Sequence, residues 1–258
     1  MTNEGRLEGS VIIRPGDWQV LTFDCYGTLI DWESGISDAL QRVLAAHQVT
    51  LPNEQVLEWY AELEAEAERG EYCEYKAVLK TVLAGFGSRL GFVPTRAELQ
   101  SLPESIRDWL PFPDTVAALR VLKRKHKLAI ISNVDDDLFA FSAQHLEVPF
   151  DWVITAQQVR SYKPSVNNFN RALERIGAPK DKVLHVAQSL FHDIVPAKAL
   201  GLSTVWINRR HGKEGFGATP PAQARPDLIV PDLKTLAAFS SGKSFPQGGD
   251  VNGLWQHR

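Results

Sequence analysis

The feature that most constrains this chain is a short apolar run that ends in a carboxylate. Residues 20–23 lead into Asp24, and the turn residues Gly27 and Thr28 follow almost at once. A continuous apolar run bounded by a turn is typical of a strand buried in a parallel sheet. Open α/β sheets gather their active sites beyond the carboxyl ends of such strands. A carboxylate there can serve as a covalent nucleophile, which makes Asp24 the leading candidate catalytic residue.

The rest of the chain divides into a helical stretch and an alternating stretch. Apolar residues recur at helical spacing across residues 36–110, with no convincing strand among them. Beyond this stretch, helices alternate with short apolar runs at 128–132, 152–155, 183–187, 203–207 and 228–230. The pattern predicts an α/β fold, namely a Rossmann-like, doubly wound parallel sheet with an inserted helical cap domain. The expected bounds are 17–32 and 111–240 for the core domain, 33–110 for the cap and 241–258 for a flexible tail.

Composition and charge exclude several classes of protein. Of the 258 residues, 44% are hydrophobic and 23% are charged, which is typical of a soluble globular protein. The net charge of −3 gives no sign of a basic surface that would bind nucleic acid. No run reaches the roughly 18 apolar residues of a membrane span, and residues 1–16 lack the apolar core of a signal peptide. The two cysteines, Cys25 and Cys73, indicate neither a metal site nor a disulfide. We expect a cytoplasmic protein that binds neither nucleic acid nor membrane.

Polar residues follow four of the predicted strands. Asp24 follows the first strand, Ser132 and Asn133 follow the second, Lys163 follows the third, and the segment 188–193 follows the fourth. In a parallel sheet these strand ends share one edge, so side chains far apart in the sequence meet in one crevice. A lone aspartate would be weak evidence, because aspartate is equally suited to a turn. Four such positions in order predict an active site.

These four motifs resemble those of the haloacid dehalogenase superfamily, and the resemblance spans about residues 21–230. The segment Asp24-Cys25-Tyr26-Gly27-Thr28 is most similar to the 2-haloacid dehalogenase branch, which carries an aromatic residue where phosphatases keep a second aspartate. The pair Ser132-Asn133 also resembles that branch. The resemblance implies a helical cap after the first motif and a small-molecule haloacid substrate. A homodimer would be ordinary for the family.

Elementary chemistry explains why an aromatic residue at position 26 separates the two activities. A phosphatase expels an alkoxide, benefits from a general acid beside the nucleophile, and needs Mg²⁺ to offset the charge of the phosphate. A halide is a good leaving group and needs no proton, so Tyr26 costs a dehalogenase little. Gln188 likewise places a neutral amide where the fourth motif of a phosphatase has a metal-binding carboxylate. We expect neither a metal nor an organic cofactor.

The resemblance implies a two-step reaction that turns short 2-haloacids into 2-hydroxy acids and halide. Asp24 would attack the halogen-bearing carbon in line and form an ester, which water would then hydrolyse. The other expected roles are those of Thr28 and Ser132 as hydrogen-bond partners of the nucleophile or substrate, Asn133 as donor to the halide, Lys163 as the charge that favours ionised Asp24, and Asp193 as the group that holds Lys163 or activates water.

The chain departs from the dehalogenase pattern in its cap and in its fourth motif. Many members of this branch carry a cap arginine that contacts the halide, but this chain has Trp59 and Tyr60 near that place. These aromatic residues are expected to bind substrate, together with Tyr26. A halide pocket narrowed by them would admit fluoroacetate. Gln188 is a candidate for positioning the hydrolytic water, and Phe169 lacks the hydroxyl of the tyrosine usual at its position.

Two other functions stay open on the sequence, a Mg²⁺-dependent phosphatase of small esters and a non-catalytic binding protein on the same fold. Several residues also have ordinary structural interpretations. Cys25 is expected to pack in the core, and the acids at 135–137 are expected to complement the positive end of a helix rather than bind metal. His192 is not favoured as a catalytic group, because adjacent side chains rarely point to one place. The glutamates at positions 62, 64, 66 and 68 are expected on a solvated helix edge.

Overall fold

The structure is a computed structural model, which describes residue 14 and residues 16–242. Within these residues a six-stranded parallel sheet has the strand order β3-β2-β1-β4-β5-β6. The strands are β1 (Val20–Phe23), β2 (Lys127–Ser132), β3 (Trp152–Thr155), β4 (Val183–Ala187), β5 (Ser203–Ile207) and β6 (Leu228–Val230). The predicted sheet is therefore confirmed. Most of the predicted tail, from 243 on, and the N-terminal residues 1–13 lie outside the described residues.

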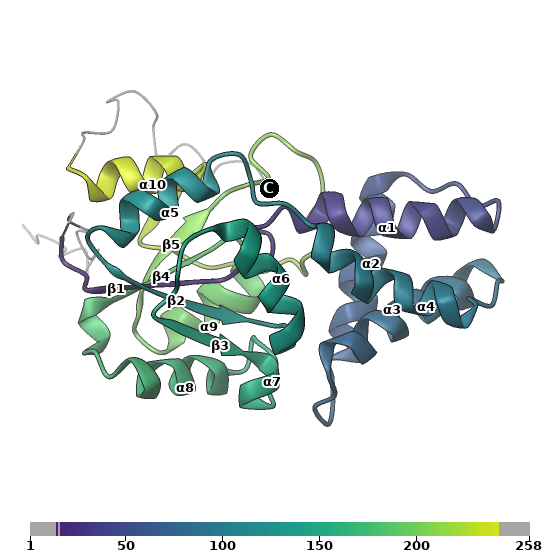
Figure 1. Cartoon of the computed structure of the whole chain (residues 1–258), viewed down its shortest axis with the longest axis horizontal. Coiled ribbons are helices and arrows are strands. Elements are labelled where there is room, and N and C mark those ends of the chain that lie inside the picture. The colour runs from purple at the N-terminus through teal and green to yellow at the C-terminus, as the bar shows by residue number, and fades with distance from the viewer. Residues whose placement is uncertain (1–13, 15, 243–258) are drawn as a thin grey trace, which may run out of the picture.

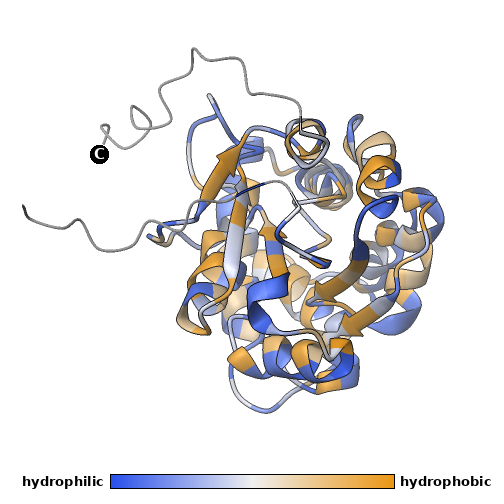
Figure 2. Ribbon diagram, turned by 90° about the vertical axis from the view of Figure 1, so that its left-hand side faces the viewer, coloured by the Kyte–Doolittle hydropathy of each residue, from blue (hydrophilic) through white to orange (hydrophobic). Residues whose placement is uncertain are grey.

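Helices cover both faces of the sheet, because successive side chains of its strands point alternately into two apolar cores. Leu21 and Phe23 of β1 join one core, and Val20 joins the other. Helices α5 (Thr115–Lys123) and α10 (Leu233–Ser240) pack on the first core, and α8 (Val166–Ile176) and α9 (Val195–Ala199) on the second. Figure 1 shows α5 and α10 on one side of the strands and α8 on the other, and Figure 2 shows the strands as mostly apolar. Among the helices of residues 16–242, none combines the length and apolar character that a bilayer crossing needs.

Four helices form a cap that is inserted between β1 and β2. They are α1 (Trp32–Ala46), α2 (Asn53–Ala67), α3 (Tyr75–Leu90) and α4 (Arg96–Ser105), followed by the 3₁₀ turn η1 (Ile106–Asp108). Asp31 caps α1 by accepting from the Ser34 N–H, and Thr95 and Glu98 form the capping box that starts α4. In Figure 1 the cap lies beside one end of the sheet. The inserted helical cap is confirmed, whereas its predicted bounds at 33 and 110 stay a prediction.

The carboxyl ends of β1, β2 and β4 lie side by side, at the place where the strand order reverses. From β1 the chain passes to β2 and β3 on one side, and then to β4, β5 and β6 on the other. Ligand sites of open α/β sheets form at such a reversal of strand order. The short elements around it are α6 (Asp136–Leu146), α7 (Ala156–Val159), the 3₁₀ turn η2 (Lys180–Lys182) and the π-helical turn η3 (Leu190–Ile194).

Candidate active site

Asp24 directly follows β1, and its carboxylate is oriented by the turn that comes after it. The Asp24 N–H donates to the Val186 carbonyl at 3.2 Å, which anchors its backbone to β4. The Thr28 hydroxyl donates to Asp24 Oδ2 at 2.7 Å. This turn needs glycine at position 27, where φ is +88° and a Cβ would lie 2.8 Å from Trp32 Nε1. Backbone and hydroxyl therefore fix the direction of the carboxylate.

Lys163 brings the positive charge to this site. Its side chain is buried, and Nζ donates to Asp24 Oδ1 at 2.9 Å, to Asp193 Oδ1 at 2.7 Å and to the Ile131 carbonyl at 2.9 Å. An ammonium group has three protons, so all of them are engaged. Asn133 holds the backbone of Lys163, because its Oδ1 accepts from the Lys163 N–H at 2.7 Å and its Nδ2 donates to the Lys163 carbonyl at 3.0 Å.

A buried histidine supports Asp193 from behind. His185 of β4 has Nε2 3.0 Å from Asp193 Oδ1 and Nδ1 2.9 Å from Thr22 Oγ1. An ionised carboxylate can only accept hydrogen bonds, so we assign a proton to Nε2, which donates to Asp193 Oδ1. Asp193 thus receives hydrogen bonds from both Lys163 and His185 on one oxygen, while its buried Oδ2 has no partner within the described residues.

The two carboxylates that share Lys163 differ in basicity. Burial raises the pKa of Asp24, the charge of Asp193 adds to this, and Lys163 offsets it only in part. Burial also opposes the ionisation of Asp193, but Lys163 and His185 outweigh it and lower the pKa of that carboxyl. Burial would lower the pKa of Lys163, but the two carboxylates outweigh it and raise that pKa. Asp24 is therefore the more basic of the two carboxylates.

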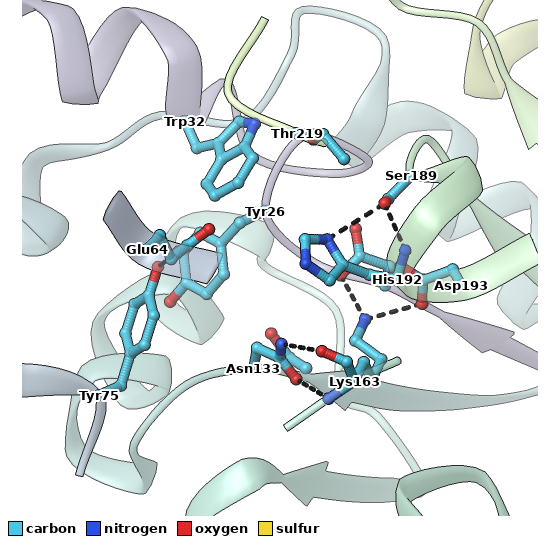
Figure 3. A pocket seen from close by; sticks show the side chains of 12 residues that line it. Tyr26, Trp32, Glu64, Tyr75, Asn133, Lys163, Ser189, His192, Asp193 and Thr219 are labelled. Atoms are coloured by element: carbon cyan, nitrogen blue, oxygen red, sulfur yellow. Dashed lines mark hydrogen bonds and ion pairs between the residues drawn. The ribbon is translucent and has the colours of Figure 1, made fainter. Parts of the chain in front are cut away.

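A pocket opens in front of Asp24, between the sheet and the cap (Figure 3). The Ser132 hydroxyl at its wall is buried and has no hydrogen-bond partner in the described part of the chain, so it is free to bind a ligand. The lining residues are Asp24, Tyr26, Ser132, Asn133, Lys163, Ser189, His192, Asp193 and Thr219 from the core, and Trp32, Glu64 and Tyr75 from the cap.

The cap side of the pocket carries a carboxyl group that the sequence interpretation missed. Glu64 of α2 is only 3% exposed, and its Oε1 accepts from the Tyr60 hydroxyl at 2.9 Å and the Tyr75 hydroxyl at 2.5 Å. The expectation of a solvated edge is therefore wrong for Glu64, although it holds for Glu66. The sequence did contain a signal, because Glu64 lies four residues after Tyr60 and seven after Leu57, on the buried face of α2.

His192 is a second group that the sequence interpretation did not favour. It points into the pocket in Figure 3, and its Nδ1 lies 3.2 Å from Ser189 Oγ, which also accepts from the His192 N–H at 2.9 Å. Burial lowers the pKa of His192 to about 4, so the imidazole is neutral near pH 7 and keeps an acceptor nitrogen. Both His192 and its neighbour Asp193 line the pocket, so the argument that adjacent side chains cannot share a site is wrong here.

Comparison with known proteins agrees with this geometry. The family model for haloacid dehalogenase-like hydrolases matches residues 18–201. The chain belongs to this family. The (S)-2-haloacid dehalogenase H-109 of Pseudomonas putida is 26% identical over 219 residues, which cover 80% of this chain and 92% of the relative. The haloacetate dehalogenase H-2 of Moraxella sp. (strain B) is 27% identical over 224 residues, which cover 84% and 96%. The crystal structure of the L-2-haloacid dehalogenase PA0810 superposes with a TM-score of 0.74 at 25% identity, covering 87% of this chain and 99% of that one.

Most residues predicted at the site of this haloacid dehalogenase-like hydrolase come together. Those that line the pocket are Asp24, Tyr26, Ser132, Asn133, Lys163 and Asp193. Thr28 lies behind Asp24, where it orients the carboxylate without lining the pocket. The ring of Tyr26 packs edge-to-face on Trp109 at 5.8 Å, and its hydroxyl lies 2.9 Å from Ser142 Oγ. Tyr26 therefore presents an aromatic surface to the pocket, with its hydroxyl already engaged.

Three of the described residues that were predicted to bind substrate lie outside the pocket lining. Tyr60 is fully buried behind Glu64, and Trp59 packs on Phe86 with a centroid distance of 5.8 Å. The Gln188 N–H donates to Thr28 Oγ1 at 2.9 Å, so this residue supports the turn that follows Asp24. None of the three belongs to the pocket lining in the described residues.

The acidic segment 135–137 does not converge on one point. Asp135 is buried and accepts from the N–H groups of Tyr75 and Lys76, at 2.9 Å and 3.0 Å, at the start of α3. Asp136 and Asp137 instead lie exposed in the first turn of α6. Across residues 16–242, no group of histidine, cysteine, aspartate and glutamate side chains is arranged to hold a metal ion. Independence from metal stays a prediction.

Proposed function

We propose that this protein is a hydrolytic dehalogenase that converts short 2-haloacids into 2-hydroxy acids and halide through an ester on Asp24. The observation that carries the proposal is the setting of Asp24, a buried carboxylate held by Thr28 and Lys163 at the wall of a pocket. Position 26, where a phosphatase has its general acid, holds an aromatic ring. The similarity to 2-haloacid and haloacetate dehalogenases supports the same chemistry.

The first step is an in-line displacement at the carbon that bears the halogen. A bond forms between an Asp24 carboxylate oxygen and this carbon while the carbon–halogen bond breaks, and the bonding pair leaves with the halide. The Ser132 hydroxyl, which has no hydrogen-bond partner in the described residues and belongs to the pocket lining, would bind the substrate carboxylate. Lys163 favours the ionised form of Asp24 and so opposes the effect of burial, which raises the pKa of this carboxyl. An in-line attack inverts the configuration of a chiral substrate.

The second step is the hydrolysis of the ester by water. Attack at the Asp24 carbonyl carbon regenerates the carboxylate and releases the 2-hydroxy acid, while a base takes the proton of the water. Two pocket groups are available for this, the unpartnered Asp193 Oδ2 and the neutral imidazole of His192. Oxygen from the water therefore stays on Asp24 after one turnover, which single-turnover mass spectrometry in ¹⁸O-labelled water would detect.

The proposal predicts halide release that depends on Asp24 and survives removal of metal. With chloroacetate and fluoroacetate in the presence of EDTA, Asp24→Asn should lower the rate by at least about 1,000-fold, because it removes the nucleophile while keeping the shape of the side chain. The matched control is Asp17→Asn, which makes the same change at an exposed position just before β1. Unchanged halide release by Asp24→Asn would contradict the role of Asp24.

The same assay separates the alternative functions. Phosphate release from a small ester that requires Mg²⁺ and stops with EDTA, without halide release, would identify a phosphatase. Release of neither halide nor phosphate would favour a binding protein. With (S)-2-chloropropionate as substrate, retained configuration in the product would contradict in-line attack.

A further inference from the structure

The pocket wall formed by the cap is acidic. Glu64 of α2 and Tyr75 of α3 line it (Figure 3). Glu68, one turn after Glu64, lies 3.4 Å from Asn133 Nδ2. Of the pocket-lining residues in the described chain, only Lys163 carries a permanent positive charge. All three of its protons are already engaged. The cap therefore offers the substrate a carboxyl group where a cation would be expected to stabilise a departing halide.

The in-line geometry makes this wall chemically important. A group displaced in line leaves on the side opposite the nucleophile. Asp24 belongs to the core wall of the pocket and Glu64 to the cap wall, and their charges are close enough to influence each other. In Figure 3, Glu64 and Tyr75 lie across the pocket from His192 and Lys163. The halide expelled by Asp24 therefore departs toward the wall that contains Glu64.

The hydrogen bonds of Glu64 determine where its proton would lie. Oε1 accepts from both Tyr60 and Tyr75. Oε2 has no partner in the described part of the chain and is not sealed from the pocket. In the neutral acid the proton is therefore on Oε2, where it can be donated to a ligand.

Burial and the charge of Asp24 favour this neutral form. Burial raises the pKa of Glu64 to about 7, the hydrogen bonds from Tyr75 and Tyr60 oppose the rise, and the charge of Asp24 adds to it. Burial likewise raises the pKa of Glu68, and Glu64 adds to that rise while Lys163 opposes it. A substrate with its own negative charge further favours the protonated state.

We propose that neutral Glu64 donates a hydrogen bond from Oε2 to the departing halide, and that it thereby accelerates fluoride release relative to chloride release. This rests on the dehalogenase function proposed above. Fluoride is the most basic and most compact halide, so it gains most from a hydrogen-bond donor in a buried site. The proton stays on Glu64, because hydrogen fluoride is a stronger acid than a carboxylic acid with a pKa of about 7. The carbon–fluorine bonding pair leaves with the fluoride as Asp24 forms its ester bond.

Two substitutions of Glu64 separate hydrogen bonding from charge. Glu64→Gln imitates the neutral acid, because its carbonyl can accept from Tyr60 and Tyr75 while its NH₂ points into the pocket. Glu64→Leu removes the donor. Glu66→Gln makes the same charge change at an exposed position of α2 and is the matched control. Circular dichroism and thermal melting would establish that each variant is folded.

The proposal predicts how the rates of fluoride and chloride release depend on pH and on these substitutions. In the wild type, kcat for fluoroacetate should fall as the pH rises through about 7 and Glu64 ionises, whereas kcat for chloroacetate should change much less. Glu64→Gln should remove this alkaline fall. Glu64→Leu should lower the ratio of fluoride to chloride release by about 10-fold to 100-fold. Tyr75→Phe should move the alkaline fall to higher pH, because the hydrogen bond from Tyr75 lowers the pKa of Glu64.

The results that would contradict the role of Glu64 differ from those that would contradict the dehalogenase function. If Glu64→Leu slows fluoride and chloride release equally, or if Glu64→Gln keeps the alkaline fall, then Glu64 only supports the two tyrosines and the proposal fails while the dehalogenase function stands. If the wild type releases neither halide at any pH, the dehalogenase function fails and this inference fails with it.

Discussion

Among the residues of the site, Lys163 pairs with two buried carboxylates that differ in basicity. Asp193 is the more acidic partner because His185 also donates to it, whereas Asp24 is the more basic one. Glu64 adds a third carboxyl group from the cap. The site can hold these groups together because Glu64 is neutral over part of the pH range and because Lys163 contacts both aspartates.

The substitution Lys163→Met tests this charge balance. It leaves Asp24 and Asp193 buried without a counter-charge, which should cost about 3–5 kcal/mol of the free energy of unfolding at pH 8. In this variant the pKa values of both carboxyls lie above their unfolded values, so the folded state binds more protons than the unfolded state. Its stability is therefore lost as the pH rises and recovers as the pH falls.

Urea unfolding at pH 5 and pH 8 would measure this effect. Lys198→Met is the control, because Lys198 pairs with Asp227 at a partly exposed position and should give a smaller loss. If Lys163→Met lowers the free energy of unfolding by the same amount at both pH values, the loss does not come from the uncompensated charge of the two carboxylates.

Among the helices, α3 of the cap is stabilised by the core at its first turn. The N-cap residue Glu74 makes no side-chain hydrogen bond to the helix. The buried carboxylate of Asp135, just before α6, instead accepts from the N–H groups of Tyr75 and Lys76. The free N–H groups at a helix N-terminus favour such a carboxylate. This contact also places Tyr75 at the pocket, so it connects the position of a cap helix to the geometry of the site.

The substitution Asp135→Ala should therefore loosen α3. We expect a loss of about 1–2 kcal/mol in the free energy of unfolding, typical of a lost helix cap, and faster hydrogen exchange at the start of α3. Asp137→Ala, in the exposed first turn of α6, removes an exposed ion pair with Lys76 and a local hydrogen bond from the Leu138 N–H, and it should cost less than about 1 kcal/mol. Equal effects of the two substitutions would contradict a capping role for Asp135.

Over the whole molecule, the loop between β5 and β6, residues 208–227, connects the core to the cap. Arg210 in this loop pairs with Glu33 of α1 at 2.6 Å and with Glu54 of α2 at 2.9 Å. The Ala218 N–H also donates to Glu33 at 3.2 Å, and the next residue, Thr219, lines the pocket. In Figure 1 this loop reaches from the sheet toward α1. The loop therefore links the position of the cap to the shape of the pocket.

The substitution Arg210→Gln should weaken this link. We expect a loss of about 1–3 kcal/mol in the free energy of unfolding, because the largely buried Glu33 loses its charged partner. We also expect a KM for haloacid raised several-fold and faster hydrogen exchange across residues 208–227. Lys213→Gln, at an exposed position of the same loop, is the control. An unchanged KM and unchanged exchange would show that the loop does not hold the cap in place.

The core of the fold and the core half of the site could be predicted from local patterns. Each strand is a short apolar run, and Asp24, Ser132, Lys163 and Asp193 lie at or beyond the carboxyl ends of the first four strands. Because parallel strands present their carboxyl ends at one edge, the order of the motifs was sufficient to bring these residues together. The cap half was predicted less well. Trp59 and Tyr60 were expected at the pocket, but the structure places Glu64 and Tyr75 there.

The sequence by itself determined the doubly wound sheet and the insertion of the cap after its first strand, and it singled out Asp24 as the candidate nucleophile, because these depend on residue periodicity and on the ends of strands. Only the tertiary structure decided which cap side chains reach the pocket. That choice depends on how α2 and α3 are rotated against the core. Contacts between residues far apart in the chain set this rotation, such as Asp135 with the start of α3 and Tyr60 with Trp32. Helical periodicity identifies a buried face, but it does not say whether that face meets a core or a substrate.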